Sequence, residues 1–208
     1  MSGAQLTSVT APAGARGVVL VLHGGAEDSR APVPGWGPAV LRMVPVARDL
    51  ARRSRGQLVV ARLRFAVRGW NGADRAPVGD TVAALTELTR RHPGLPVALV
   101  GHSMGGRAAV HAAGAEGVRC VVALAPWLTG EDPVAQLDGR RLLIAHGTAD
   151  RITSAGESRR YADRARAAGV EVTYAVVEGG EHTMLWRAPR WHRLTTDFVL
   201  ESLLPGCA

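Results

Sequence analysis

The fold is decided by the stretch Val97-Ala98-Leu99-Val100-Gly101-His102-Ser103-Met104-Gly105-Gly106. Its first four residues are apolar and predict a buried strand, and a helical pattern begins directly after Ser103. Glycine at both Gly101 and Gly105 lets a sharp strand-to-helix turn close, because neither residue brings a side chain into the turn. The stretch therefore predicts a serine hydroxyl above the end of a strand and at the N-terminus of a helix, where the amide dipoles favour developing negative charge.

Outward from this turn, short β-branched runs alternate with longer helical patterns along the chain. We expect strands at about residues 6–10, 18–22, 58–63, 97–100, 119–124, 142–145 and 171–177, and helices at about 39–53, 80–91, 104–114, 154–168 and 189–203. Such alternation is typical of an α/β fold with a mostly parallel central sheet, here of about six to seven strands, covered by helices on both faces. No repeat or linker interrupts it, so residues 1–208 are expected to form a single domain.

Composition narrows the class of protein. The chain has 208 residues, of which 47% are apolar, enough to bury a sizeable core and a pocket. It contains no run of about 18 to 20 apolar residues that would span a membrane. Its first residues lack the basic start and apolar core of a secretory signal, so a cytoplasmic location is expected. Cys120 lies in an apolar run and is expected to be a small buried residue, whereas Cys207 lies near the C-terminal end.

The net charge of +7 comes from a chain in which all 25 basic residues are arginine. A nucleic-acid-binding protein would gather its basic residues on one element, with aromatic residues among them. Here the arginines are spread along the chain with acidic residues near many of them, which is typical of a solvated surface. We therefore expect no nucleic-acid partner.

A serine hydroxyl is a poor nucleophile unless a base takes its proton and an acid orients that base. The chain offers both after Ser103. Asp150 follows a strand and a glycine turn and precedes a helix, and His182 follows the strand at 171–177 through a glycine-rich loop. The carboxyl ends of parallel strands lie at one edge of a sheet, so Ser103, Asp150 and His182 are expected to meet there within hydrogen-bonding distance.

Other residues compete for these roles. Asp132 or Glu131 is an alternative acid, but both lie in the loop after the preceding strand. Among the histidines, His23 and His146 each precede a glycine at a strand end and are expected to brace loops through hydrogen bonds. His102, next to the serine, is expected to shape the pocket.

Acyl transfer also needs two donors for the oxyanion of its tetrahedral intermediate. The Met104 amide, at the helix start, is expected to be one. The other is expected from the sequence His23-Gly24-Gly25-Ala26 after the strand at 18–22, where small residues let the backbone approach the substrate. We expect Gly25 to supply this donor, with Ala26 as the alternative.

The glycine pair after His23, the turn around Ser103, the His146-Gly147-Thr148-Ala149-Asp150 turn and the Gly180-Glu181-His182 loop together resemble the α/β-hydrolase superfamily. The likeness covers about Val18 to Leu204 and is strongest to its small dienelactone-hydrolase-like and carboxylesterase branches. The chain departs from the dienelactone hydrolases in having serine where they use cysteine. It also departs from the family in two lengths: about seventeen residues precede Val18, so the family's first strands are expected to be shortened or missing, and only residues 126–139 follow the strand at 119–124, too few for a helical cap domain.

Without a cap, loops must build the pocket. The irregular segments 26–38 and 64–78 and the start of 126–139 supply the candidate substrate-binding residues, with His102 from the turn; they are Ala26, Trp36, Arg64, Phe65, Arg68, Trp70, His102 and Trp127. Aromatic rings there could hold an apolar acyl or ring group. Arg64 and Arg68 could hold a substrate carboxylate by bidentate contacts.

The sequence therefore predicts a serine hydrolase that cleaves a carboxylic ester of a small molecule through an acyl-serine, without a metal or organic cofactor. Thioester hydrolysis, cyclising transfer and amide cleavage on the same three residues remain open. So does a non-catalytic binding protein of the same fold. The oligomeric state, the substrate and the pathway are not encoded in any pattern of this sequence.

Overall fold

The centre of the molecule is a seven-stranded sheet with the order β1-β3-β2-β4-β5-β6-β7. The computed structural model describes residues 3–204. Its strands are β1 (Gln5–Thr10), β2 (Gly17–Leu22), β3 (Leu58–Arg64), β4 (Val97–His102), β5 (Val118–Leu124), β6 (Arg141–Gly147) and β7 (Glu171–Val177). β1 runs antiparallel to β3, and every other neighbouring pair is parallel. The predicted α/β class and mostly parallel sheet are confirmed.

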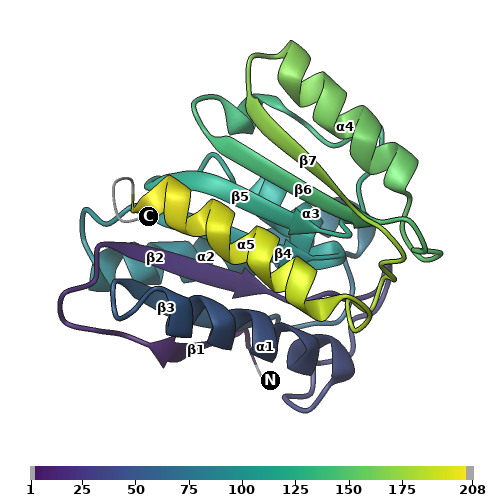
Figure 1. The fold of residues 1–208 in the computed structure, drawn as a ribbon. Helices are drawn as coiled ribbons and strands as arrows, with labels where there is room; N and C mark the ends of the chain where they lie inside the picture. Colours follow the sequence, from purple (N-terminus) through teal and green to yellow (C-terminus); the bar gives the residue numbers. More distant parts are fainter. Residues whose placement is uncertain (1–2, 205–208) are drawn as a thin grey trace.

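Helices cover both faces of this sheet (Figure 1). They are α1 (Pro38–Arg53), α2 (Ala76–Arg91), α3 (Met104–His111), α4 (Ala155–Ala167) and α5 (Ala188–Leu203). α1 and α5 share one hydrophobic core with one face of the sheet, and α2, α3 and α4 share a second core with the other face. Two buried faces explain why β2 and β4 are apolar almost throughout, since all six residues of each strand are buried.

Helix boundaries follow local sequence signals. α2 begins at Ala76, four residues before the expected start, because Pro77 in its first turn has the backbone angle of a helix and needs no amide partner. α3 ends at His111, three residues early, where the chain turns toward β5. α4 is capped by the Ser154 hydroxyl, which accepts a hydrogen bond from the Glu157 amide.

The connections change direction between the neighbouring strands β2 and β4. The chain leaves β2 toward α1 on one face of the sheet and leaves β4 toward α3 on the other (Figure 1). Loops diverge at such a switch in direction, and ligands of open α/β sheets bind there. The Gly24-Gly25 and Ser103 turns both lie at this point.

The segment 126–139 forms a loop with a single 3₁₀ turn, Ala135–Leu137. The prediction that no helical cap is built there is confirmed. Cys120 is fully buried, as expected, and Cys207 lies outside the described residues. Within residues 3–204, no helix is both long enough and apolar enough to cross a membrane.

Candidate active site

The turn that carries Ser103 is strained and depends on its glycines. Ser103 has φ 54° and ψ −120°, a backbone conformation that residues with a Cβ rarely adopt. A Cβ on Gly101 would lie 2.1 Å from the Gly105 carbonyl oxygen, and one on Gly105 would lie 2.4 Å from the His23 carbonyl oxygen. Only glycine fits at either position, so the turn predicted from the sequence forms between β4 and α3.

Ser103, His182 and Asp150 meet at the carboxyl edge of the sheet. The Ser103 hydroxyl donates to His182 Nε2 at 3.1 Å, and His182 Nδ1 donates to Asp150 Oδ2 at 2.9 Å. Asp150 lies three residues beyond β6, and His182 lies five residues beyond β7. Both contacts expected from the sequence are therefore present. They form the hydrogen-bonded chain by which a histidine can take a proton from a serine.

Hydrogen bonds hold Asp150 as a carboxylate in spite of its burial. Its side chain is fully buried, and burial by itself would raise its pKa. Hydrogen bonds from His146 and His182 and from the Thr153 and Ile152 amides oppose this and lower the pKa of Asp150 well below its ordinary range. An ionised Asp150 can stabilise a positive charge on His182. Ser103, in contrast, is 8% exposed and can be reached from solvent.

Asp150 has a second histidine partner, His146. His146 Nε2 lies 3.3 Å from Asp150 Oδ2, and His146 Nδ1 accepts from the buried Ser158 hydroxyl at 2.9 Å. The Thr153 hydroxyl lies 3.0 Å from the same carboxylate oxygen and 3.2 Å from His182 Nδ1. The expectation that His146 braces a loop is correct, and the loop is the one that carries Asp150. The sequence analysis missed Thr153, whose position three residues after an aspartate at a helix start was its only signal.

The competing acids lie elsewhere. Asp132 is buried and accepts hydrogen bonds from Arg107 and from His111, both at 2.7 Å, and from the Thr129 amide. These bonds tie the loop after β5 to α3. Glu131 is exposed. Neither carboxylate contacts His182, so the geometry favours Asp150 as the partner of the histidine.

The Gly25 and Met104 backbone amides are the two expected oxyanion donors near Ser103. Within the described chain, neither the Gly25 nor the Met104 amide donates to a backbone carbonyl, whereas the Ala26 amide donates to the Arg68 carbonyl oxygen at 2.8 Å. The alternative donor Ala26 is thus occupied. A Cβ on Gly25 would lie 2.3 Å from both the Arg68 carbonyl oxygen and Met104 Cε. Glycine is needed there to bring the loop after β2 against the start of α3.

The two histidines that flank these turns are buried and neutral. Phe65 N donates to His23 Nε2 at 3.1 Å, and His23 Nδ1 donates to the Gly24 carbonyl oxygen, so His23 braces the loop as expected. Burial, chiefly, lowers the pKa of His23 to about 4. His102 is 1% exposed and donates from Nε2 to the His182 carbonyl oxygen at 2.8 Å. The prediction that His102 shapes the pocket is wrong, because its ring supports the loop of His182 from inside.

A cavity of about 520 Å³ adjoins the Gly25 amide. Its lining includes Ala26, Trp36, Arg68 and Arg42, of which Arg42 was not anticipated. Trp36 is 76% exposed at its rim. The segments 26–33 and 66–71 build its wall through backbone hydrogen bonds such as Arg68 N to the Ala31 carbonyl oxygen and Trp70 N to the Ala26 carbonyl oxygen. Loops therefore form part of the pocket wall, as expected, and the first turns of α1 form the rest.

Three other predicted substrate contacts are wrong or altered. Phe65 is fully buried and packs against the His23 ring. Trp70 is 4% exposed, and the Arg107 guanidinium lies against both its ring and that of Trp127, two rings that meet edge to face. Trp127 keeps some exposure and lines a separate depression with Ile152 and Thr153. These aromatic residues of irregular segments thus pack mainly against the protein interior and not in the pocket, because burying a ring stabilises the fold more than leaving it exposed.

The prediction that Arg64 lies beside Arg68 in the substrate pocket is also wrong. The Arg64 guanidinium donates to Gln5 Oε1 at 3.0 Å and to the Val33 carbonyl oxygen, and it lines a different cavity from Arg68. The predicted pair of Arg64 and Arg68 around one carboxylate is therefore not formed. Arg42 and Arg68 are the two arginines that share the cavity beside Gly25.

One protein-family model matches part of the chain. The model of a family described as Hydrolase_4, serine aminopeptidase S33, matches residues 67–141. That segment, about a third of the chain, includes Ser103 but neither Asp150 nor His182. No curated protein sequence matches the chain significantly.

Solved structures match nearly the whole chain. A dienelactone hydrolase from Anabaena variabilis is 19% identical over 96% of this chain and 98% of its own, with a TM-score of 0.67. The chain has the α/β-hydrolase fold. Two further solved structures are also similar to this chain over nearly its whole length. Est1E from Butyrivibrio proteoclasticus is 14% identical over 96% of this chain and 93% of its own, with a TM-score of 0.66. An alpha-beta serine hydrolase homologue from Coxiella burnetii is 17% identical over 96% and 95%, with a TM-score of 0.68.

Metal-binding side chains are not gathered at the site of this α/β-hydrolase-fold protein. Among residues 3–204, no group of three or more histidine, cysteine, aspartate or glutamate side chains is arranged to hold a metal ion.

Proposed function

We propose that this protein is a serine hydrolase that cleaves carboxylic esters of small molecules through Ser103, His182 and Asp150. The observation that carries the proposal is the hydrogen-bonded chain from the Ser103 hydroxyl through His182 to the buried Asp150 carboxylate, at 3.1 and 2.9 Å. A serine in a strained turn, a histidine base and an ionised acid are the groups that acyl transfer requires.

The first half of the reaction forms an acyl-serine. Ser103 Oγ attacks the ester carbonyl carbon while His182 Nε2 takes the hydroxyl proton, and Asp150 stabilises the imidazolium. The Gly25 and Met104 amides donate to the oxyanion of the tetrahedral intermediate. The C–O bond to the leaving alcohol then breaks, and His182 returns the proton to the alcohol oxygen.

The second half repeats these steps with water. His182 takes a proton from a water molecule, whose oxygen attacks the acyl carbon. Collapse of the second tetrahedral intermediate breaks the bond to Ser103 Oγ, which recovers its proton from His182. The products are a carboxylic acid and free enzyme, and none of these steps consumes a cofactor.

The similar structures support an ester substrate. They include esterase PE8 and a carbohydrate esterase from gut microbiota, and Est1E has also been solved with ferulic acid bound. The cavity beside Gly25 has Trp36 at its rim and Arg42 and Arg68 in its wall, so it can hold an apolar acyl group and, near the arginines, an acidic substituent.

Paired substrates of equal acyl length test the proposal. Hydrolysis of p-nitrophenyl butanoate and of a butanoyl thioester is measured with the wild-type protein and with Ser103→Ala. We expect hydrolysis of the oxygen ester that is lost with Ser103→Ala. Faster turnover of the thioester would favour a thioesterase on the same residues, and hydrolysis of neither ester would favour a binding protein of the same fold.

A further inference from the structure

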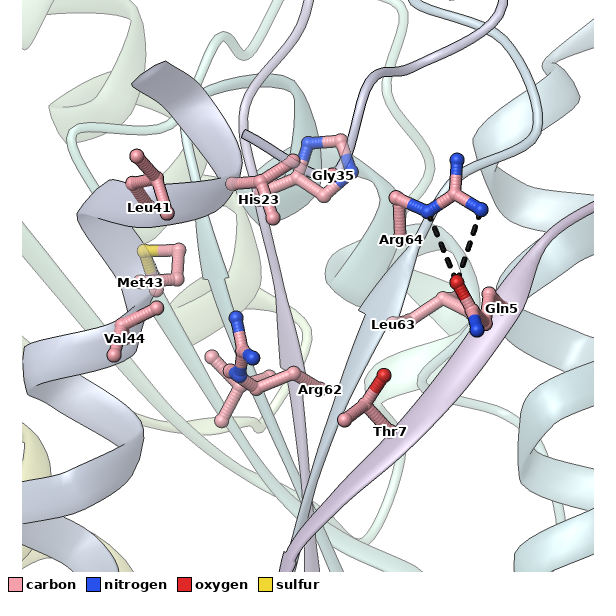
Figure 2. A pocket seen from close by; sticks show the side chains of 12 residues that line it. Gln5, Thr7, His23, Gly35, Leu41, Met43, Val44, Arg62, Leu63 and Arg64 are labelled. Atoms are coloured by element: carbon pink, nitrogen blue, oxygen red, sulfur yellow. Dashed lines mark hydrogen bonds between the residues drawn. The ribbon is translucent and has the colours of Figure 1, made fainter. Parts of the chain in front are cut away.

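A second cavity, of about 130 Å³, lies between α1 and the edge strands β3 and β1 (Figure 2). Its floor is the face of the sheet that carries Thr7, Arg62 and Val21, which are paired across β1, β3 and β2. α1 supplies its opposite wall with Leu41, Met43 and Val44. Neither Ser103 nor Gly25 is among its lining residues.

Arg62 breaks the apolar pattern of its strand. Val60 and Leu58, which precede it on the same face of β3, are fully buried in the core under α1. Arg62 is half-buried, and Figure 2 shows its side chain rising from β3 into the middle of the cavity. In the part of the chain that the structure describes, its guanidinium forms no hydrogen bond or ion pair. Withdrawing a cation from water without a partner is costly, so this position favours an anionic occupant.

The surroundings of Arg62 add positive charge and no negative charge. Among the described lining residues none is acidic, and a second arginine, Arg64, also lines the cavity, where it donates to Gln5 Oε1 (Figure 2). Asp49, farther along α1, is already engaged by Arg52 and Thr196. His23 is neutral, because burial, chiefly, and the nearby Arg64 and Arg62 together lower its pKa to about 4.

The remaining groups define the class of the anion. Gln5 accepts from Arg64 through Oε1, which leaves its amide N–H groups able to donate, and Thr7, whose hydroxyl is a further donor, pairs with Arg62 across β1 and β3 and lines the cavity. The wall opposite these donors is apolar. A cavity of 150 Å³ holds a molecule as large as benzene, so about six non-hydrogen atoms fit in a space of this size. A ligand with a carboxylate at one end and a short alkyl chain at the other matches both walls.

We propose that this cavity binds a short aliphatic carboxylate, with the carboxylate on Arg62 and the alkyl chain against Leu41, Met43 and Val44. Arg62 makes a charge-assisted contact of the kind that guanidinium groups form with carboxylates. The site is independent of the proposed esterase activity, since Ser103, His182 and Asp150 are not among its lining residues. Its closest link to the candidate active site is His23, whose Nδ1 donates to the carbonyl oxygen of Gly24, the residue before Gly25.

Calorimetric titration with sodium butanoate tests this site without reference to catalysis. Ionic strength is held constant with sodium chloride. We expect one saturable site in the wild-type protein and binding at least tenfold weaker in Arg62→Met. Arg119→Met is the matched control, because Arg119 also lies on a strand but is exposed on β5, and it should bind butanoate like the wild type. If Arg62→Met does not fold, as judged by circular dichroism, Arg62→Gln replaces it.

Other outcomes overturn the proposal. The absence of saturable binding to the wild-type protein would contradict it, as would equal affinity in the Arg62 variant. Binding that survives in the Arg62 variant but is lost in Arg68→Met would assign butanoate to the cavity beside Gly25 instead. Inorganic phosphate that binds at Arg62 as tightly as butanoate would show that the alkyl wall has no role.

Discussion

His146 and His182 share one oxygen of Asp150: His146 Nε2 lies 3.3 Å and His182 Nδ1 lies 2.9 Å from Asp150 Oδ2. His146 is in turn held by the Ser158 hydroxyl at the N-terminal end of α4. The carboxylate that orients the proposed catalytic base is therefore fixed from two sides. His146 is a positioning residue in this arrangement, since it does not contact Ser103.

Replacement of His146 by Phe should lower kcat about tenfold with little change in KM. It keeps a planar ring but removes a hydrogen bond to a buried carboxylate, which is worth roughly 1.5 to 3 kcal/mol. Ester hydrolysis and thermal unfolding are measured together. Ser158→Ala is the control, because it leaves the contact between His146 and Asp150 in place and should retain most of kcat. A loss of stability in His146→Phe with an unchanged kcat would mean that His146 serves the fold alone.

Asp150 should make stability sensitive to acid. Its pKa in the folded protein is lower than its ordinary value, so it binds a proton less readily than in the unfolded chain. Its contribution is therefore complete above the unfolded pKa of about 3.9 and is lost as the pH falls toward the folded value. Between pH 5 and pH 3, the free energy of unfolding from urea titrations should fall more steeply for the wild type than for Asp150→Asn. Parallel curves would contradict this.

A methyl group on Gly25 should disable the proposed oxyanion site. In Gly25→Ala the new Cβ meets the Arg68 carbonyl oxygen and Met104 Cε at 2.3 Å, so the loop must move away from Ser103. Loss of one oxyanion donor typically costs about 10²- to 10³-fold in kcat. Gly35→Ala, in the same loop but with no atom within 4 Å of its Cβ, is the control and should keep wild-type kcat. Equal effects of the two substitutions would argue against a specific role of the Gly25 amide.

Arg68 and Arg64 should behave differently toward a carboxylate-bearing ester. Arg68 lines the cavity beside Gly25, and Arg64 does not. Arg68→Met should raise KM for such an ester about tenfold, since a charge-assisted contact is worth roughly 1.5 to 3 kcal/mol, and should leave a neutral ester nearly unchanged. Arg64→Met should leave KM for both esters unchanged. If Arg68→Met changes KM for both esters equally, the cavity has no preference for acidic substrates.

The sequence predicted the strands, the helices and the meeting of Ser103, Asp150 and His182 because these depend on local patterns and on the common edge of a parallel sheet. Strand bounds were close, since both faces of β2 and β4 are buried and their apolar runs are continuous. The glycines made the Ser103 turn predictable, because no side chain fits at Gly101 or Gly105.

Side-chain directions in the loops were not predictable in this way. Phe65, Trp70 and His102 were expected at the pocket and lie in the interior. Arg64 and Arg68 are four residues apart, yet pairing of segments 26–33 and 66–71 turns them toward different cavities. No local spacing encodes that pairing. The same holds for Arg42, which α1 brings to the cavity from the far side, and for Thr153, which depends on the approach of β6 and β7.

Mass spectrometry of the protein after treatment with a fluorophosphonate tests the central claim most directly. The reagent phosphonylates serine hydroxyls that a neighbouring base activates, and it needs no knowledge of the substrate. The account predicts one adduct per wild-type chain, mapped to Ser103, no adduct in Ser103→Ala, and labelling slowed at least 100-fold in His182→Ala, as expected when the base of such a triad is removed. An unlabelled wild-type protein, or an equal adduct in Ser103→Ala, would contradict it.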